Sequence, residues 1–468
     1  MKLKKGDELK LKIETLAFEG KAIARLDGLV VFVNEGVPGD TVRAAITKVK
    51  SQYLEARNLE LLEPSDLRVE PRCRYVGSCG GCKMQHIDYT AQLSLKHQHV
   101  IDSFERIGKI KDIEIPPPVG AEEIFFYRNK MEFSFSDQRW LTTAEIESGE
   151  EYDKNFALGL HVPGRYDKVL DIEECWLQSN ESNRILDSIR RSAKEQDIRP
   201  YTTHSHEGFL RFLVIKQSRA TGEIMVNIVT SDNRQDIMQP VIERLRTDVP
   251  GVTTVVNNIN RRKAQVAVGD EEVVYFGTGY ITERIGHFTF RISANSFFQT
   301  NSGQAEKLYS IAKEFGELSN DDVVLDLYSG TGTITIYLSD AAKMVYGIES
   351  VEDAVKDAGE NALLNDIGNV RFIQGDVLEK LQTREAWLKE EPAVLYHDPP
   401  RSGVHPKAIR EIINLRIPKI VYVSCNPATQ ARDIAALREH GYRIERIQPV
   451  DMFPHTYHIE NVVRLVIR

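Results

Sequence analysis

The 468-residue sequence lacks any apolar segment close to the 20 or so residues that a membrane-spanning helix needs. Its first residues do not resemble a signal peptide, and internal repeats and low-complexity tracts are absent. We therefore expect a cytoplasmic chain without a membrane partner. Its length is enough for about three domains.

The sequence also lacks an overall basic excess, because 60 Lys and Arg stand against 69 Asp and Glu, a net charge of −9. This balance argues against wholesale electrostatic binding to nucleic acid. Residues 1–60 differ, with eleven basic and nine acidic residues. In this segment, short strand-like runs separated by Gly, Asp and Pro predict a small β-barrel. The runs are 9–13, 21–26, 29–33, 41–48 and 54–61.

Cysteine is scarce, with five in the chain, yet three of them lie close together. Cys73, Cys79 and Cys82 share a short segment with two glycines that let the backbone wrap closely around a metal, and Cys175 follows far along the chain. Structural disulfides are rare in cytosolic proteins, so the spacing predicts a four-cysteine metal site. A zinc site is one reading that the ligand chemistry allows.

The carboxyl-terminal half alternates buried strand-like runs with helical segments, which predicts an α/β fold. A tight glycine turn, Ser329 to Gly332, separates the strand 323–328 from a helix that begins at Thr333. The nicotinamide dehydrogenase reading is weakened because Thr335 stands where that motif has its third glycine. Four successive strands carry a carboxylate at or near their ends, and such ends form the ligand edge of open α/β sheets. These residues are Asp326, Glu349, Asp376 and Asp398.

Cys425 and Glu460 are the candidate chemical groups. Cys425 follows the strand-like run 420–423 and precedes Asn426-Pro427, which opens a helix. A helix amino terminus next to the thiol is expected to lower its pKa and favour the thiolate. Glu460 stands just before the apolar run 462–467, so it too is placed at the edge of the sheet. A nucleophile and a base beside a cofactor site suggest covalent chemistry on an electron-poor ring.

Five motifs in order resemble those of the RNA (uracil-5-)-methyltransferase family, namely Phe297 to Asn301, Asp326 to Gly332, Asp398 to Arg401, Ser424 to Pro427 and His458 to Glu460. The resemblance covers essentially the whole chain. It differs in Ser329, where many relatives carry Cys, at a position not expected to do chemistry.

The resemblance implies that S-adenosyl-L-methionine is the cofactor, that Cys425 is the nucleophile and that Glu460 is the base. It implies a [4Fe-4S] cluster at the four cysteines, with a structural or RNA-positioning role, and a monomer that binds RNA. The implied cofactor-binding residues are Gln299, Tyr328, Thr333, Glu349, Asp376 and Asp398.

The implied architecture is α/β. A TRAM barrel, of the oligonucleotide-binding type, is expected over residues 1–61 and a central α+β iron-sulfur domain over 62–285. A class I Rossmann-like methyltransferase domain is expected over 286–468. In the central domain we expect a helix over 91–107, which by analogy packs against the catalytic domain, and a strand over 125–133. Arg128 and Lys130 in that strand are candidates for RNA contact. The acidic stretch 145–153 is expected to be a solvated loop or hairpin tip and not a site.

The covalent route explains why a thiol and a carboxylate are needed. Carbon 5 of uracil is too weak a nucleophile to take a methyl group unaided, and thiolate addition at carbon 6 gives it electron density. A base must then remove the proton from carbon 5 before the thiolate can leave. The resemblance therefore implies methylation of carbon 5 of a uridine in RNA. It favours 23S ribosomal RNA, because transfer-RNA members of the family generally lack both the barrel and the four cysteines.

Four alternatives stay open. The first is a transfer-RNA uridine C5-methyltransferase. A radical methylthiotransferase would share the TRAM domain and the cluster but usually needs a different cysteine spacing. An amino-group methyltransferase would have an aromatic residue where this chain has Arg401. A non-catalytic RNA-binding or ribosome-assembly protein could dispense with Cys425 and Glu460.

Overall fold

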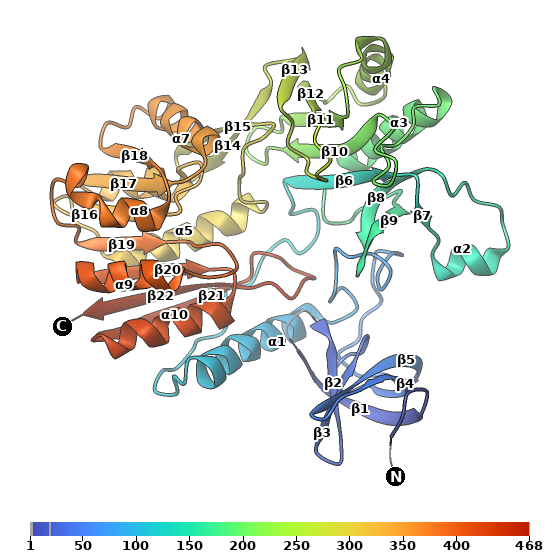
Figure 1. Ribbon diagram of the computed structural model, residues 1–468, viewed down its shortest axis with the longest axis horizontal. Helices are drawn as coiled ribbons and strands as arrows, with labels where there is room; N and C mark the ends of the chain where they lie inside the picture. Colours follow the sequence, from blue (N-terminus) through green and yellow to red (C-terminus); the bar gives the residue numbers. More distant parts are fainter. Residues whose placement is uncertain (1–2, 18–19, 468) are drawn as a thin grey trace.

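The computed structural model describes residues 3–17 and 20–467. In this part of the chain a closed barrel is followed by an eight-stranded sheet and a seven-stranded sheet, with a two-stranded hairpin between the last two (Figure 1). Within these two ranges, no helix is both long enough and apolar enough to cross a bilayer.

The expected amino-terminal barrel is present. Its strands are ordered β1-β2-β3-β5-β4, and alternate side chains such as Ile13, Val31 and Val42 fill its interior. Strand β5 runs two residues past the expected end at residue 61. The barrel strands are β1 (Glu8–Leu16), β2 (Ala22–Leu26), β3 (Leu29–Val33), β4 (Thr41–Val49) and β5 (Tyr53–Glu63).

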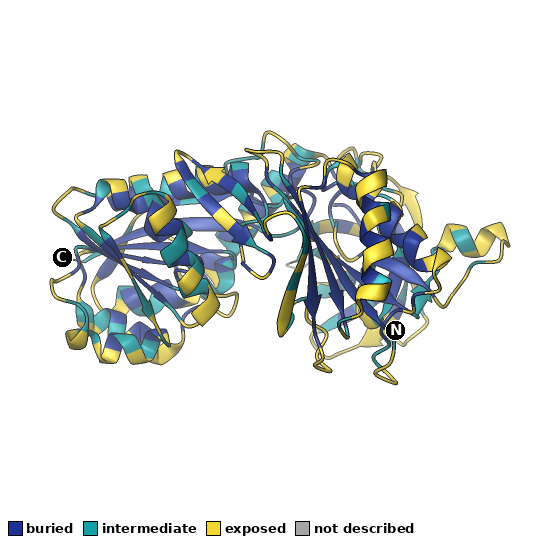
Figure 2. Ribbon diagram, turned by 90° about the horizontal axis from the view of Figure 1, so that it is seen from above, coloured by how far each residue is buried: buried dark blue, intermediate teal, exposed yellow. Residues whose placement is uncertain are grey.

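The central sheet has the order β13-β12-β11-β10-β6-β8-β9-β7. Helices α3 (Asn180–Glu195) and α4 (Gln235–Asp248) share its apolar core. Figure 2 shows its strands as buried and the outward faces of the helices as exposed. The strands are β6 (Lys130–Ser136), β7 (Arg139–Trp140), β8 (Ala157–Val162), β9 (Arg165–Asp171), β10 (Leu210–Gln217), β11 (Ile224–Thr230), β12 (Thr254–Ile259) and β13 (Glu271–Phe276).

Two local expectations in this region were wrong. The strand expected over 125–133 begins only at Lys130, because Phe126 has a left-handed backbone (φ 54°) and its amide donates to the carbonyl of Trp176. The acidic stretch 145–153 is partly helical, since α2 (Thr143–Ser148) begins at a capping box between Thr142 and Glu145. None of the residues of α2 is buried.

The carboxyl-terminal sheet has the order β18-β17-β16-β19-β20-β22-β21, in which β22 alone is antiparallel to both of its neighbours. Helices α5, α6 and α7 share one apolar cluster with the sheet, and α8, α9 and α10 share another. The helices are α5 (Ser302–Gly316), α6 (Thr333–Leu338), α7 (Glu352–Leu364), α8 (Val377–Gln382), α9 (Pro406–Leu415) and α10 (Pro427–Glu439). The strands are β16 (Val323–Leu327), β17 (Met344–Glu349), β18 (Val370–Gln374), β19 (Val394–His397), β20 (Lys419–Ser424), β21 (Tyr442–Val450) and β22 (Glu460–Ile467).

Two further elements join this layer. The hairpin of β14 (Tyr280–Ile285) and β15 (Phe288–Ser293) packs in the cluster of α5 and so spans the expected boundary at residue 285. Helix α1 (Tyr89–Asp102), which continues as a π-helical turn to Ile107, runs beside α10 (Figure 1). Val100 and Phe104 belong to the same apolar cluster as Ile434 of α10, the packing that the family resemblance implied.

Candidate active site

The predicted cofactor residues gather at the carboxyl edge of neighbouring strands. Glu349 ends β17, Asp376 follows β18 and Asp398 follows β19, while Tyr328 follows β16 between β17 and β19. The chain moves outward from β16 to β18 and then returns to β19 on the other side, so β16 and β19 flank a topological switch point. Open α/β sheets bind their ligands in the crevice at such a point.

The turn after β16 is preshaped for a ligand. Tyr328 adopts a left-handed backbone (φ 65°), which is unfavourable for a residue with a side chain and is typical of functional sites. The amide of Gly330 then donates to Glu349 Oε2 (3.0 Å), which ties the turn to the end of β17. Glu349 Oε1 accepts from the amide of Val351 (2.8 Å). These bonds fix the carboxylate that the sequence assigns to a ribose.

Gln299 and Thr333 both lie near Tyr309, a residue that the sequence analysis did not single out. The hydroxyl group of Tyr309, a buried residue of α5, lies near enough to both side chains for them to lower its pKa, against the larger effect of burial. Asp398 and Asp326 lie near enough for their charges to raise the pKa of Tyr309, although burial is the main cause. By contrast, Asp376 caps α8 by accepting from the amide of Glu379 (3.2 Å).

Cys425 and Glu460 are brought together by strand register. Strands β20 and β22 are antiparallel, and Ser424 pairs with Asn461. Cys425 is the next residue along β20 and Glu460 the preceding residue of β22, so the two face each other across the end of this pair. Cys425 is partly buried, and Glu460 is 5% exposed. A thiol and a carboxyl group 35 positions apart in sequence therefore lie at the same end of one strand pair.

The surroundings of Cys425, Glu460 and Asp398 disfavour negative charge. Burial raises the pKa of the Cys425 thiol to about 12, and the carboxyl groups of Glu460 and Asp398 add to the increase. The expectation that the start of α10 would lower this pKa was therefore wrong, because burial and the two acids outweigh it. Burial also raises the pKa of Asp398 to about 7 and that of Glu460 well above its ordinary value.

Arg401 is the cation that opposes these increases. Its charge lowers the pKa of both Cys425 and Glu460. Its guanidinium Nη2 lies 3.5 Å from Nε2 of His458, whose pKa falls to about 4 through burial first and then through the charge of Arg401. A neutral imidazole therefore stands beside the cation. The Asp398-Pro-Pro-Arg401 motif was the sequence signal for this residue, although its electrostatic role was not anticipated.

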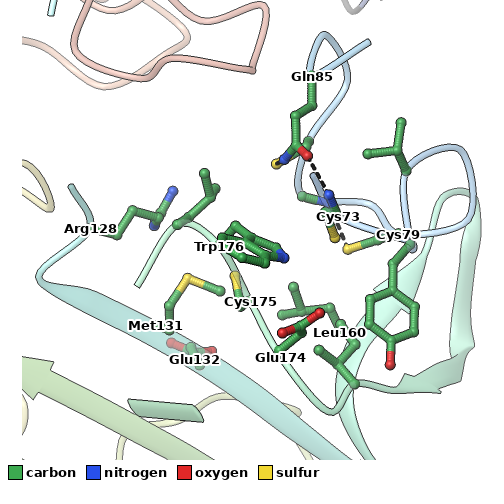
Figure 3. A pocket seen from close by; sticks show the side chains of 16 residues that line it. Cys73, Cys79, Gln85, Arg128, Met131, Glu132, Leu160, Glu174, Cys175 and Trp176 are labelled. Carbon is green, nitrogen blue, oxygen red and sulfur yellow. Dashed lines mark hydrogen bonds between the residues drawn. The ribbon is translucent and has the colours of Figure 1, made fainter. Parts of the chain in front are cut away.

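The four remaining cysteines line one cavity of about 220 Å³ (Figure 3). The chain around them is held by polar contacts, since the amide of Cys73 donates to Gln85 Oε1 (2.7 Å) and Gln85 Nε2 lies 3.7 Å from Cys82 Sγ. The pKa of each thiol is raised by burial. The cavity is lined by Cys73, Cys79, Cys82 and Cys175.

The spacing of these thiols bears on what they can bind. Among the described residues, no three His, Cys, Asp or Glu side chains form a group close enough to hold a single metal ion. Zinc needs four sulfurs at about 2.3 Å from one point. A [4Fe-4S] cluster takes one thiolate for each iron, and the four thiols that line this cavity are the donor set it would use.

Arg128 precedes strand β6 and Lys130 is its first residue, so the two do not share one strand face. Arg128 lines the cavity, and its Nε donates to the carbonyl of Lys130 (3.3 Å). Lys130 Nζ lies 3.6 Å from Glu132 Oε2. The charge of Arg128 also acts on His458 and Cys175. Arg128 is therefore placed between the cysteines and the catalytic pocket.

The sheet order, the helices on both of its faces and the carboxylates at its ligand edge define a class I methyltransferase. The family described as "tRNA (Uracil-5-)-methyltransferase" matches residues 206–468, and the TRAM domain matches residues 2–59. The chain belongs to this RNA (uracil-5-)-methyltransferase family and is an S-adenosylmethionine-dependent RNA methyltransferase.

Relatives match over nearly the whole chain. An uncharacterized RNA methyltransferase of Chlorobaculum tepidum is 47% identical over 99% of this chain and 97% of its own length. One from Bacteroides thetaiotaomicron is 43% identical over 97% of this chain and 100% of its own. Among solved structures, the tRNA (uracil-54, C5)-methyltransferase of Pyrococcus abyssi, in complex with S-adenosyl-L-homocysteine, is 30% identical with a TM-score of 0.75. That match covers 98% of this chain and 100% of the other.

Proposed function

We propose that this enzyme methylates carbon 5 of a uridine in 23S ribosomal RNA through a covalent bond between Cys425 Sγ and carbon 6 of the uracil. The observation that carries the covalent route is the register of β20 and β22, which sets Cys425 opposite Glu460 at the ligand edge of the sheet. An amino-group methyltransferase would need neither side chain. The paired thiol and carboxyl group therefore favour carbon methylation.

The proposed reaction balances with these two residues. The Cys425 thiolate forms the S–C6 bond, and the electron pair of the C5–C6 double bond moves to carbon 5. Carbon 5 would take the methyl group from the sulfonium of S-adenosylmethionine, and the electron pair of the broken S–methyl bond would stay on that sulfur, which leaves as S-adenosylhomocysteine. Glu460 then accepts the proton of carbon 5, the double bond re-forms and the C6–S bond breaks, which restores the thiolate. The raised pKa of Glu460 makes it a stronger base than an exposed glutamate.

Gln299, Tyr328, Thr333, Glu349, Asp376 and Asp398 are the proposed cofactor-binding residues. Glu349 offers an oriented carboxylate to the ribose hydroxyl groups. S-adenosylmethionine, when bound, supplies a methyl group on a positively charged sulfur, and this charge offsets the carboxylates that disfavour the thiolate. The charge of Asp398 raises the pKa of both Cys425 and Tyr309, so such an offset would matter there.

The four cysteines are proposed to hold a [4Fe-4S] cluster, because all four line one open cavity. Its role is structural, since the methyl transfer requires no electron. The cluster and the barrel together favour ribosomal RNA, and we propose that the enzyme acts on it as a monomer.

A transfer-RNA substrate is the second candidate. The Pyrococcus abyssi enzyme, which is named for uracil 54 of tRNA, matches 98% of this chain, so a chain of this size and fold can act on tRNA. Mapping of 5-methyluridine in the ribosomal RNA and the tRNA of a deletion strain distinguishes the two candidate substrates. Loss of one ribosomal position supports the first proposal, loss in tRNA alone supports the second, and an unchanged map in both refutes the two together.

A further inference from the structure

The loop 451–459, which joins β21 to Glu460, is held from outside the catalytic sheet (Figure 1). At its start, the buried pair Lys96 and Asp451 is joined at 2.6 Å, and Lys96 Nζ also donates to the carbonyl of Phe453 (3.0 Å). In its middle, His455 has a left-handed backbone (φ 66°). A residue with a side chain adopts this conformation only where its surroundings hold it.

Both backbone groups of His455 bond to one segment of the amino-terminal half. The amides of Lys83 and Met84 each donate to the His455 carbonyl at 2.9 Å. Gln92, in the first turn of α1, accepts from the His455 amide through Oε1 (2.9 Å) and places Nε2 3.2 Å from Nδ1 of the His455 ring. Gln92 is fully buried, and its Nε2 also donates to the carbonyl of Ile87 (2.9 Å).

This segment begins directly after Cys82. Its hold on His455 fixes the loop five residues before Glu460, and Gln92 Oε1 is the acceptor for the His455 amide. We propose that Gln92 is a positioning residue for Glu460, through which the cysteine-bearing segment sets the base of the reaction. The inference rests on the function proposed above and adds a residue outside the motifs that define it.

The test uses the full-length, iron-loaded enzyme and compares Gln92→Met with Gln178→Met. Methionine has a similar volume to glutamine but cannot make these hydrogen bonds. Gln178 is a matched control, because it is also fully buried and its Nε2 donates to a backbone carbonyl, that of Ile215 (3.0 Å), inside the central domain. Each variant is incubated with uridine RNA and methyl-labelled S-adenosylmethionine, and amide hydrogen exchange is followed over residues 452–459.

We expect Gln92→Met to methylate the uracil in a single turnover but to release product about tenfold more slowly than wild type, because the base is displaced. It should accumulate a denaturation-resistant complex of protein, RNA and label, with cofactor affinity within about threefold. Its loop amides should exchange faster than those of wild type. Gln178→Met should show neither the complex nor the faster loop exchange.

Other results overturn the inference. Gln92→Met could lose methyl transfer and release in equal measure, without the complex, or could release product as fast as wild type. In either case Gln92 does not act through Glu460. Accumulation of the complex in Gln178→Met would equally refute a specific role. If wild-type enzyme forms no 5-methyluridine in either RNA, the proposed function fails instead, so the two failures are distinguishable.

Discussion

Substitution of Glu460 by Gln separates the two halves of the proposed reaction. The amide keeps the shape of the side chain but cannot accept the proton of carbon 5. A positioned general base contributes about 100- to 10,000-fold, or about 3–5 kcal/mol, to a proton transfer. The substitution also removes the carboxyl group that, after burial, contributes most to the raised pKa of Cys425. Thiolate addition should therefore be preserved or eased, while turnover falls about 100-fold or more.

The assay is a single turnover with uridine RNA and methyl-labelled cofactor, resolved under denaturing conditions. The variant should accumulate a complex carrying protein, RNA and label, whereas wild type should show little of it at steady state. In wild type, product release should quicken as pH rises through the raised pKa of Glu460, because only the ionised carboxylate accepts the proton of carbon 5. Slow turnover without any labelled complex would mean that Glu460 acts in binding or thiol activation, and Asp398 would be the next candidate for the base.

Three other substitutions test separate parts of the molecule. Cys425→Ala should abolish transfer and the covalent complex with 5-fluorouracil RNA, yet bind cofactor within about threefold of wild type; turnover would remove the thiol from the mechanism. Cys175→Ser should eliminate the absorbance near about 400 nm and the roughly four irons of anaerobically purified protein, and stoichiometric zinc without iron in wild type would contradict the cluster. Burial raises the pKa of Asp326 from 3.8 in the unfolded chain to about 7, so the folded state binds the proton more tightly. Protonated Asp326 therefore adds up to about 4 kcal/mol to the free energy of unfolding. This stabilisation is fully present below pH 4 and is lost as pH rises toward 7. Asp326→Asn should therefore flatten the melting temperature between pH 5 and 8, and a profile as steep as that of wild type would refute this.

The sequence predicted those parts of the fold that depend on local pattern. The alternation of the barrel strands and the apolar runs of the parallel sheet are visible in single segments, and the structure confirms both the barrel and the class I fold. The positions of Glu349 and Asp398 at strand ends could be predicted from the same apolar runs. The pairing of Cys425 with Glu460 could be suspected only from their places at two strand ends, because the register of β20 and β22 is a property of two distant segments.

The remaining features of the site depend on contacts between segments that are distant in sequence, so they could not be predicted from local pattern. Tyr309 sits in an ordinary amphipathic helix, and only the folded chain brings its hydroxyl group to Gln299 and Thr333. The pKa of Cys425 depends on how deeply the thiol is buried and on two acids from other strands, so the helix next to it gave the wrong direction. The sequence pattern of residues 125–129 is typical of a strand, but Phe125 packs against a distant residue. Its ring lies against that of His455, with ring centroids 4.4 Å apart.

Strand β22 is the last strand in the sequence, yet it lies inside the sheet, between β20 and β21. During synthesis the chain emerges from its amino terminus, so β20 and β21 are complete while the strand that separates them is still missing. Cys425 then has no partner, and the loop that α1 holds has no base attached to its end. The order of synthesis therefore places the nucleophile ahead of the base, and the pairing of Cys425 with Glu460 is complete only when β22 has been inserted between β20 and β21.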